Sequence, residues 1–254
     1  MESNNTDKER YLKKAVSLAP TEWRYTHGLT NYYNGQKEYG KALQIIKPFF
    51  ATRKNHSSSA SLYVRTLVYN RQYEEAEKIL NTIHILPFEG ERVGRVIYRE
   101  IKMMLATQAL SKGKIKEAEK KVTETFLWPR NLGAGKPFDD LIDTRLEDWM
   151  NAMIAIKSKN LADKELNLKK VAQSTHGVND FSTLLQCVAW WQLGEQQKAN
   201  DLFTKWSSLQ KNTAYKEWGD RFYKNNREKA YPFDFEEMTQ LIGVISGGRD
   251  TRLF

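Results

Sequence analysis

Residues 73–76 read Tyr-Glu-Glu-Ala and repeat an earlier group, Tyr-Gly-Lys-Ala at 39–42, so that Ala42 and Ala76 stand 34 residues apart. Related groups follow as Ile-Lys-Glu-Ala at 115–118 and Gln-Gln-Lys-Ala at 196–199, each shortly after a glycine, and a weaker version begins at Leu161. Self-similarity at a period of a few tens of residues indicates that one short structural unit recurs along the chain. The sequence therefore predicts an array of similar units.

Apolar residues on both sides of each group follow a helical spacing. Around residue 73 the series comprises Ala60, Tyr63 and Leu67, then Ala76, Leu80 and Ile83. One pair of helices cannot bury such faces alone, so neighbouring pairs must stack on one another. The alternation of apolar and polar residues that marks strands is missing. These patterns predict an all-α fold.

The 34-residue period, with a glycine, an aromatic or aliphatic residue and then an alanine, resembles the tetratricopeptide repeat. In that family two antiparallel helices meet at a tight turn, and the small alanine lets the second helix approach the first. The resemblance implies a tetratricopeptide-like α-α superhelix, a right-handed solenoid of about five to six helical hairpins. We expect a single domain over 1–254, with repeats at 21–54, 56–88, 92–128, 138–174 and 179–211 and capping helices over 212–246.

Two intervals between repeats are longer than the others because loops are inserted at 86–91 and 127–137. Phe-Glu-Gly at 88–90 and Asn-Leu-Gly-Ala-Gly-Lys-Pro-Phe at 131–138 resemble the C-terminal repeat region of a family of large bacterial proteins. The N-terminal domain of that family is similar to galactose-mutarotase-like β-sandwiches. The resemblance covers roughly 20–210, although the family usually has Trp in place of Phe88 and Tyr in place of Phe138. Apolar loop residues predict that both loops are ordered against the array; they are Phe88, Leu127, Trp128, Leu132 and Phe138.

The first residues read as part of an incomplete repeat. Residues 11–18, followed by Ala-Pro, have the pattern of the second helix of a unit whose first helix is missing. We therefore expect the chain to be excised from a longer protein. Residues 1–10 lack the apolar core of a signal peptide. The expected compartment is the cytoplasm if Met1 is the natural start, and the periplasm if a longer parent chain carries a signal peptide.

Composition argues against several classes of partner. The chain has 40 Lys and Arg against 31 Asp and Glu, a formal net charge of +9, and a mean hydropathy of −0.67. Basic and acidic residues are interspersed without a long run of either sign, which is typical of solvated helix faces rather than of nucleic-acid binding. No stretch reaches the ~18 apolar residues of a membrane span. We expect neither nucleic acid nor a membrane as partner, and a buried, unreactive Cys187.

No motif of a catalytic, cofactor or metal site stands out. Gly-Ala-Gly-Lys at 133–136 departs from a phosphate-binding loop because Pro137 stands where the hydroxyl residue is needed and no strand precedes it. The acidic residues at 139, 140 and 143 are expected to begin the helix after Pro137. We expect scattered surface histidines rather than metal ligands; they are His27, His56, His84 and His176. The prediction is no catalytic residue, no cofactor and no metal.

Arrays of the tetratricopeptide family bind partners with the concave face formed by the first helix of each hairpin. The predicted binding residues on this face are Arg24, His27, Asn31, Arg65, Tyr69 and Trp191, and those in the inserted loops are Glu89, Trp128 and Lys136. Further inward positions predict a groove that is polar in its first half and apolar in its second. They are Asn34, Glu100, Met103, Thr107, Trp149, Met153, Leu184 and Val188.

The leading hypothesis is a non-catalytic helical-repeat scaffold that binds a protein or peptide, or the missing N-terminal domain of its own parent chain, through the concave face. The alternative follows from the family resemblance alone. It is an accessory region of a carbohydrate-active enzyme, in which the loops and tryptophans contribute to a sugar-binding site. Titration with a panel of mono- and oligosaccharides separates the two hypotheses.

Overall fold

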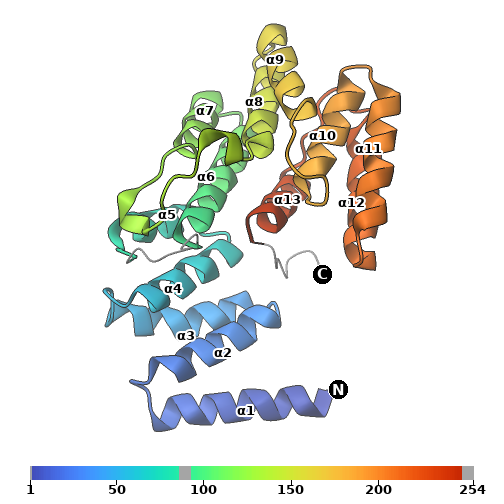
Figure 1. Cartoon of the computed structure of the whole chain (residues 1–254). Helices are drawn as coiled ribbons and strands as arrows, with labels where there is room; N and C mark the ends of the chain where they lie inside the picture. The colour runs from blue at the N-terminus through green and yellow to red at the C-terminus, as the bar shows by residue number, and fades with distance from the viewer. Residues whose placement is uncertain (1, 86–92, 248–254) are drawn as a thin grey trace. The chain divides into compact units, whose positions relative to one another are not determined.

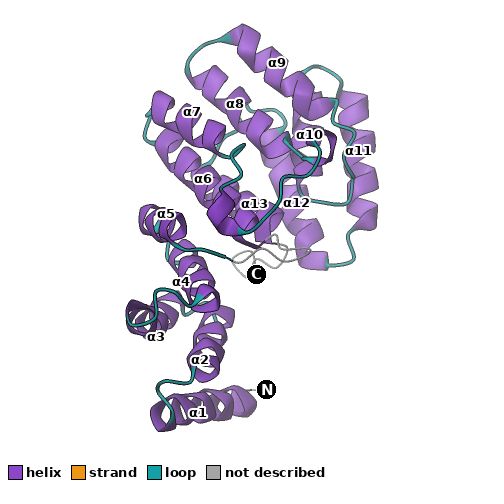
Figure 2. Cartoon of the chain, turned by 60° about the vertical axis from the view of Figure 1, so that its left-hand side comes forward, coloured by secondary structure: helices purple, strands orange, loops and turns teal. Residues whose placement is uncertain are grey.

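The computed structural model describes residues 2–85 and 93–247, and every regular element within these ranges is helical. The described ranges hold thirteen α-helices (Figure 2), and two short 3-10 helices lie between α7 and α8. The fold class is therefore all-α, as the apolar periodicity predicts. None of the helices in the described ranges is both long and apolar enough to cross a bilayer.

The chain divides into two compact units, and the boundary falls inside α6 (Val93–Ser111). Unit 1 comprises Met1–Ile101 and Trp128–Gly135, and unit 2 comprises Lys102–Leu127 and Lys136–Phe254. Unit 1 holds α1 (Glu2–Leu18), α2 (Trp23–Gly35), α3 (Tyr39–Ala51), α4 (Ser57–Tyr69), α5 (Tyr73–Thr82) and the 3-10 helix Arg130–Leu132. Unit 2 holds α7 (Ile115–Glu124), the 3-10 helix Asp139–Leu141, α8 (Arg145–Lys157), α9 (Leu161–Ala172), α10 (Ser182–Gln192), α11 (Gln196–Leu209), α12 (Thr213–Asn226) and α13 (Phe235–Gly247).

One type of turn ends the first helix of each pair. Five residues at these turns have a positive φ of 58–86°; they are Lys37, Arg71, Gly113, Lys159 and Gly194. The N–H group that follows each of them donates to the carbonyl five residues earlier, at 2.8–3.0 Å. This is the Schellman arrangement, which satisfies the free carbonyls at a helix C-terminus. The chain thus builds the same turn five times within the described residues.

The alanine of the repeated motif stands five residues after the turn residue. Four such alanines have no exposed surface; they are Ala42, Ala76, Ala118 and Ala199. The predicted burial of these alanines is confirmed, and Lys164 takes the position in the remaining pair. An alanine has no side chain beyond Cβ, so the two helices of a pair approach closely at this point. The pairs α2–α3, α4–α5, α8–α9 and α10–α11 lie side by side in Figure 1.

The first helices of successive pairs also contact one another. In unit 1, α2 contacts α4, and in unit 2, α10 contacts both α8 and α12. Leu29 and Tyr33 of α2 form a cluster with Ala42, against which Leu12 and Val16 of α1 pack. In unit 2 the fully buried side chains include Trp149, Trp206 and Cys187, and burial raises the pKa of the Cys187 thiol, as expected of an unreactive cysteine.

The two last helices form a further pair, close to the predicted positions. Trp218 Nε1 of α12 donates to Gln240 Oε1 of α13 at 2.9 Å, and Asn226 Nδ2 donates to Glu237 Oε2 at 2.9 Å. On its other side α12 meets α11, where Gly219 faces the ring of Trp206. Glycine lets the two helix backbones approach each other at this contact.

The second inserted loop is ordered over one part of its length. Asn131 Nδ2 donates to the carbonyls of Leu80 and Ile83 at 3.1 and 2.9 Å, and Ile85 N–H donates to Asn131 O at 2.8 Å. Leu132 is buried, and Gly133 has the positive φ of 69° that ends the 3-10 helix. This part of the loop therefore packs against the end of α5 within unit 1, as its apolar residues predict.

Two expectations about the same region are wrong. Leu127 is 56% exposed and Phe138 is 81% exposed, so these side chains do not bury themselves. The helix after Pro137 does not begin at Asp139, because a 3-10 turn comes first and α8 starts at Arg145. Asp143 accepts the N–H of Arg145 at 3.0 Å, so it lies just before the helix. The first inserted loop, with Phe88, lies outside the described residues.

Candidate functional site

A ladder of polar contacts joins the first helices of unit 1. His27 Nε2 on α2 lies 2.8 Å from Ser59 Oγ on α4, and Asn34 Nδ2 donates to Thr66 Oγ1 at 3.1 Å between the same two helices. Arg65 on α4 forms an ion pair with Glu100 on α6, whose side chain has no exposed surface. All three contacts join residues 32 to 35 positions apart. They are contacts between successive units of the repeat.

The predicted binding residues of this face fall into two groups. His27 and Arg65 take part in the ladder, and Tyr69 packs on Tyr39 with ring centroids 5.2 Å apart. Arg24 and Asn31 are exposed, and the Arg24 guanidinium pairs with Glu22 at 3.0 Å and lies 4.9 Å from the Trp23 ring. The exposed members are therefore the ones that an outside molecule can reach.

The expected groove does not extend to the deeper inward positions. Seven of them have no exposed surface; they are Glu100, Met103, Thr107, Trp149, Met153, Leu184 and Val188. The prediction of an apolar groove in the second half is wrong. A helical wheel identifies the inward side of each first helix, but the helices packed around it bury most of that side. These residues form core.

The sequence suggested that the histidines are scattered over the surface, but two of them lie close together. The ring centroids of His27 and His56 lie 6.1 Å apart, and Trp23 packs within 4.9 and 5.3 Å of the two rings. His56 also caps α4 by accepting the N–H of Ser59 at 3.2 Å. Across the described residues, no group of three or more His, Cys, Asp or Glu side chains is placed to hold a metal ion.

The other predicted site residues make no contact in the ladder described above. Trp191 is half-buried, with the Arg227 guanidinium 4.5 Å from its ring, and Trp128 is half-buried beneath Arg95 at 4.4 Å. Lys136 pairs with Asp139 at 2.7 Å. Glu89 lies outside the described residues.

A buried guanidinium holds the start of α8 in unit 2. Arg145, 1% exposed, donates to both oxygens of Asp143 and to both oxygens of Asp180, at 2.7–3.1 Å. Thr183 and Gln186 of α10 accept longer hydrogen bonds from it at 3.3 and 3.4 Å. Gln186 in turn donates to the carbonyl of Ala172 at the end of α9 and to that of Ser174 just after it, both at 2.9 Å. The network fastens the segment between α9 and α10 to the first turn of α8.

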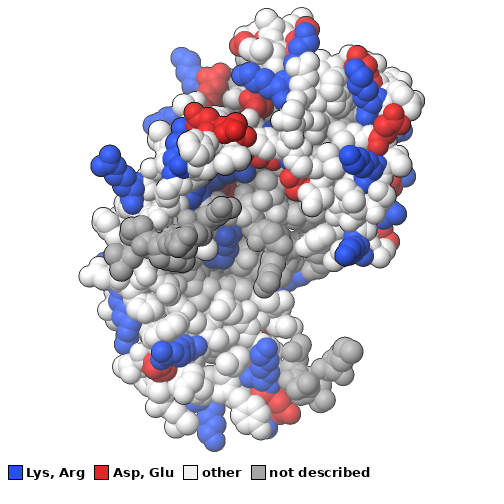
Figure 3. Space-filling model, viewed as in Figure 1, with Lys and Arg blue, Asp and Glu red and all other residues white. Residues whose placement is uncertain are grey.

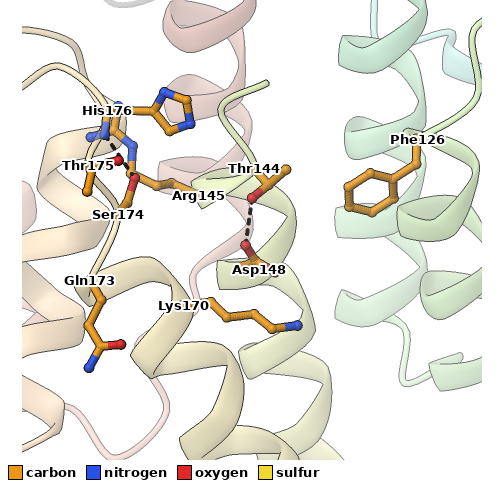
Figure 4. A pocket seen from close by; sticks show the side chains of 9 residues that line it. All are labelled: Phe126, Thr144, Arg145, Asp148, Lys170, Gln173, Ser174, Thr175 and His176. Carbon is orange, nitrogen blue, oxygen red and sulfur yellow. Dashed lines mark hydrogen bonds between the residues drawn. The ribbon is translucent and has the colours of Figure 1, made fainter. Parts of the chain in front are cut away.

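Beside this network lies a cavity of about 490 Å³. Its lining comes from α8, α9, the segment after α9 and the end of the α7 segment; the residues are Phe126, Thr144, Arg145, Asp148, Lys170, Gln173, Ser174, Thr175 and His176. Figure 4 shows Asp148 and Thr144 on one side of the cavity and the Phe126 ring on the other. Concave sites with a few converging polar groups are the places where small molecules or side chains bind.

Asp148 is the half-buried acid of this cavity. Thr144 Oγ1 donates to Asp148 Oδ2 at 2.8 Å. Burial raises the pKa of the Asp148 carboxyl, and the Thr144 hydrogen bond and the Lys170 charge oppose this, while Glu147 and Asp143 add to it. The carboxylate is thus poorly stabilised by its surroundings, which is a common property of ligand-binding acids.

Sequence reasoning missed this cavity. Thr144 and Asp148 are four residues apart at the start of a helix, a spacing that signals a local hydrogen bond and no more. Lys170, Ser174 and His176 reach the same place because the α9–α10 segment is tied to Arg145 through Asp180. Nothing in the local sequence marks that convergence.

A second cavity of about 490 Å³ lies on the other side of the α9 C-terminus. It shares Gln173 and Ser174 with the first and is otherwise lined by residues of α9, α10 and α11, among them Trp190 and Asp201. The Lys198 ammonium lies 4.8 Å from the Trp190 ring.

The basic and acidic side chains visible in Figure 3 are interspersed rather than gathered into one patch. No protein-family model matches the chain, and no curated protein matches it in sequence.

Proposed function

We propose that the chain is a non-catalytic interaction module of the tetratricopeptide-like class, whose hairpins follow a right-handed solenoid and whose first helices bind a protein or peptide. The observation that carries the proposal is the recurring turn, with its buried alanine five residues later. Contact between alternate helices is what a stacked hairpin array needs. Such arrays present long surfaces of first helices to their partners.

The exposed inward side chains of unit 1 offer the best surface for a partner. Arg24 and Asn31 lie seven residues apart on α2, on the face from which His27 reaches α4. A guanidinium and an amide suit the carbonyl and carboxylate groups of a peptide. The ladder behind them holds α2 and α4 in place, so the surface is preorganised.

The carbohydrate-related alternative is less well supported. Sugar stacking needs an open aromatic face, and each of the three tryptophans Trp128, Trp190 and Trp191 carries a cationic side chain 4.4–4.8 Å from its ring. A sugar would have to displace that cation. We therefore base the proposal on peptide binding.

A peptide-display selection tests the proposal. A random peptide library is panned against the immobilised chain and, in parallel, against a variant carrying Arg24→Glu and Asn31→Ala. The control is Lys47→Glu on α3, an exposed position with the same charge change as Arg24→Glu. We expect a peptide consensus that binds the wild type and the control at least tenfold better than the double variant. No enrichment, or equal binding to all three proteins, contradicts the proposal.

A further inference from the structure

The carboxylate of Asp148 has no cationic partner. It accepts a hydrogen bond from the hydroxyl of Thr144, and within the described ranges of the chain no basic group lies within ion-pair distance of it. A half-buried carboxylate in this position is costly unless a positive group compensates it. Asp148 opens into a cavity of about 490 Å³, so the space for such a group is present.

The nearby guanidinium does not compensate Asp148. Arg145 is held by Asp143 and Asp180, two carboxylates for one positive charge. Glu147 is buried next to Asp148 in the chain and adds to the negative charge. The remaining basic group of the lining is Lys170, whose side chain is exposed. Within the described residues, neither Arg145 nor Lys170 therefore forms an ion pair with Asp148.

An aromatic ring lines the same cavity as the acid. Phe126 is 45% exposed, and Figure 4 shows its ring on the side opposite Asp148. The face of an aromatic ring attracts cations, and the attraction grows when the cation leaves water. A positive group between Phe126 and Asp148 gains from both walls, while an anion would meet the carboxylate without a paired cation.

We propose that the cavity between Asp148 and Phe126 binds an ammonium or guanidinium group. The group pairs with the carboxylate of Asp148 and lies against the ring of Phe126, and its alkyl chain fills the rest of the space. It can come from a free alkylamine or alkylguanidine, or from a lysine or arginine side chain of a partner. The site is in unit 2 and does not depend on the peptide surface proposed for α2.

Lys170 is the internal competitor for this site. Its charge favours the ionised form of Asp148, although the two groups form no ion pair in the described part of the chain. Removing the charge of Lys170 should therefore strengthen binding of an outside cation. The other ionisable groups of the site are His176 on the rim, Arg145 with its partners, and Glu147. Because the pKa of Asp148 is raised by burial, cation binding should strengthen as pH rises and its carboxyl group loses its proton.

Calorimetric titration with four small probes tests the proposal. Butylamine and butylguanidine carry the positive group, and butanol and butyramide are neutral compounds of similar size. We expect saturable binding of the two cations, at least tenfold tighter than that of the neutral probes. Asp148→Asn should weaken cation binding at least tenfold, Phe126→Leu severalfold, and Lys170→Gln should tighten it severalfold.

Asp201→Asn is the matched control, because Asp201 lines the neighbouring cavity and the charge change is the same. It should leave the affinity for butylguanidine unchanged. Thermal melts show whether Asp148→Asn is folded, and the Phe126 and Lys170 variants keep the test decisive if it is not. Absence of saturable binding, equal binding of butyramide, or unchanged affinity in Asp148→Asn overturns the proposal.

A blocked Gly-Arg-Gly tripeptide distinguishes the two sources of the cation. Tighter binding than that of butylguanidine identifies a partner's side chain, and exclusion of the tripeptide identifies a free small molecule. Peptide selection on the Arg24 and Asn31 surface is independent of both results, so the failure of one proposal leaves the other testable.

Discussion

His27 and His56 share one hydroxyl group. Nε2 of His27 and Nδ1 of His56 each lie 2.8 Å from Ser59 Oγ. The N–H of Ser59 also points at His56 Nδ1, so that this nitrogen accepts and carries no proton. Because a hydroxyl group has one proton, Ser59 donates to His56 and accepts from the Nε2–H of His27. The arrangement ties α2 to the first turn of α4.

Stability should fall as pH is lowered through the histidine range. Burial, together with the nearby His56, lowers the pKa of His27 from its usual value of 6.5. The unfolded chain then binds a proton where the folded chain does not. The contribution of His27 is complete above its unfolded pKa and is lost as pH falls toward the folded value.

Urea denaturation at about pH 5 and about pH 8 measures this effect. His27→Gln should reduce the difference in the free energy of unfolding between the two pH values. The exposed His84 is the control, and His84→Gln should keep the wild-type difference. The same pH dependence in His27→Gln and in the wild type would show that His27 is not responsible.

Substitutions at the recurring turn should change stability in opposite directions. Arg71 has a φ of 58°, a backbone conformation that costs a non-glycine residue about 1–2 kcal/mol. Arg71→Gly should therefore raise the free energy of unfolding by about 0.5–1 kcal/mol, after the extra chain entropy of glycine is subtracted. Gly113→Ala should lower it by about 1 kcal/mol, because φ is 73° there while the space for a Cβ is open.

Gly40 provides the control for these substitutions. It lies in α3, has open space around it and no positive φ, so that Gly40→Ala should stabilise the helix by about 0.5–1 kcal/mol. The same sign for Gly40→Ala and Gly113→Ala in urea denaturation would contradict the assignment of the turn.

Gly219→Ala should destabilise unit 2 by packing rather than by backbone conformation. A Cβ at this position would lie 2.1 Å from an atom of the Trp206 ring. Trp206 is fully buried, and its Nε1 donates to Asp180 O at 2.9 Å, so the ring cannot move away freely. Overpacking of this kind costs about 1–3 kcal/mol. Thermal denaturation measures the loss. Gly219→Ser also adds a Cβ, so a wild-type melting temperature for either Gly219→Ala or Gly219→Ser would contradict the close contact.

Breaking the Arg145 network should be more damaging than breaking a surface ion pair. Removing one partner of a buried charge pair costs about 3–5 kcal/mol, because the remaining charges are left uncompensated. Arg145→Ala should show a loss of this size, and Arg145→Lys should recover only part of it, since one ammonium cannot donate in parallel to both carboxylates.

The exposed pair of Lys169 and Glu165 on α9 is the comparison for Arg145. Lys169→Ala should leave the urea midpoint close to that of the wild type, because water and salt screen exposed pairs. A similar midpoint for Arg145→Ala and Lys169→Ala would mean that the network does not stabilise the fold.

Local sequence determined the helices, their turns and the buried alanines of this protein. A helix depends on interactions among residues three and four positions apart. Its apolar face and its end can therefore be predicted from a short stretch of sequence. The repeat spacing predicted that four alanines are buried, and all four have no exposed surface; they are Ala42, Ala76, Ala118 and Ala199. The helix pair at 212–246 was also predictable from its own apolar pattern.

Only the tertiary structure decided which of these residues face solvent, core or cavity. Val188 and Trp149 lie on the inward side of their helices, and packing of neighbouring helices buries both. Phe138 stays exposed although its character favours burial, because no partner surface in the described chain covers it. The cavity beside Asp148 exists because Arg145 holds Asp180, 35 residues away, and brings the α9–α10 segment to the start of α8. Contacts at such separations depend on how whole helices stack, and the local apolar periodicity of one helix does not determine the angle at which it packs on the next.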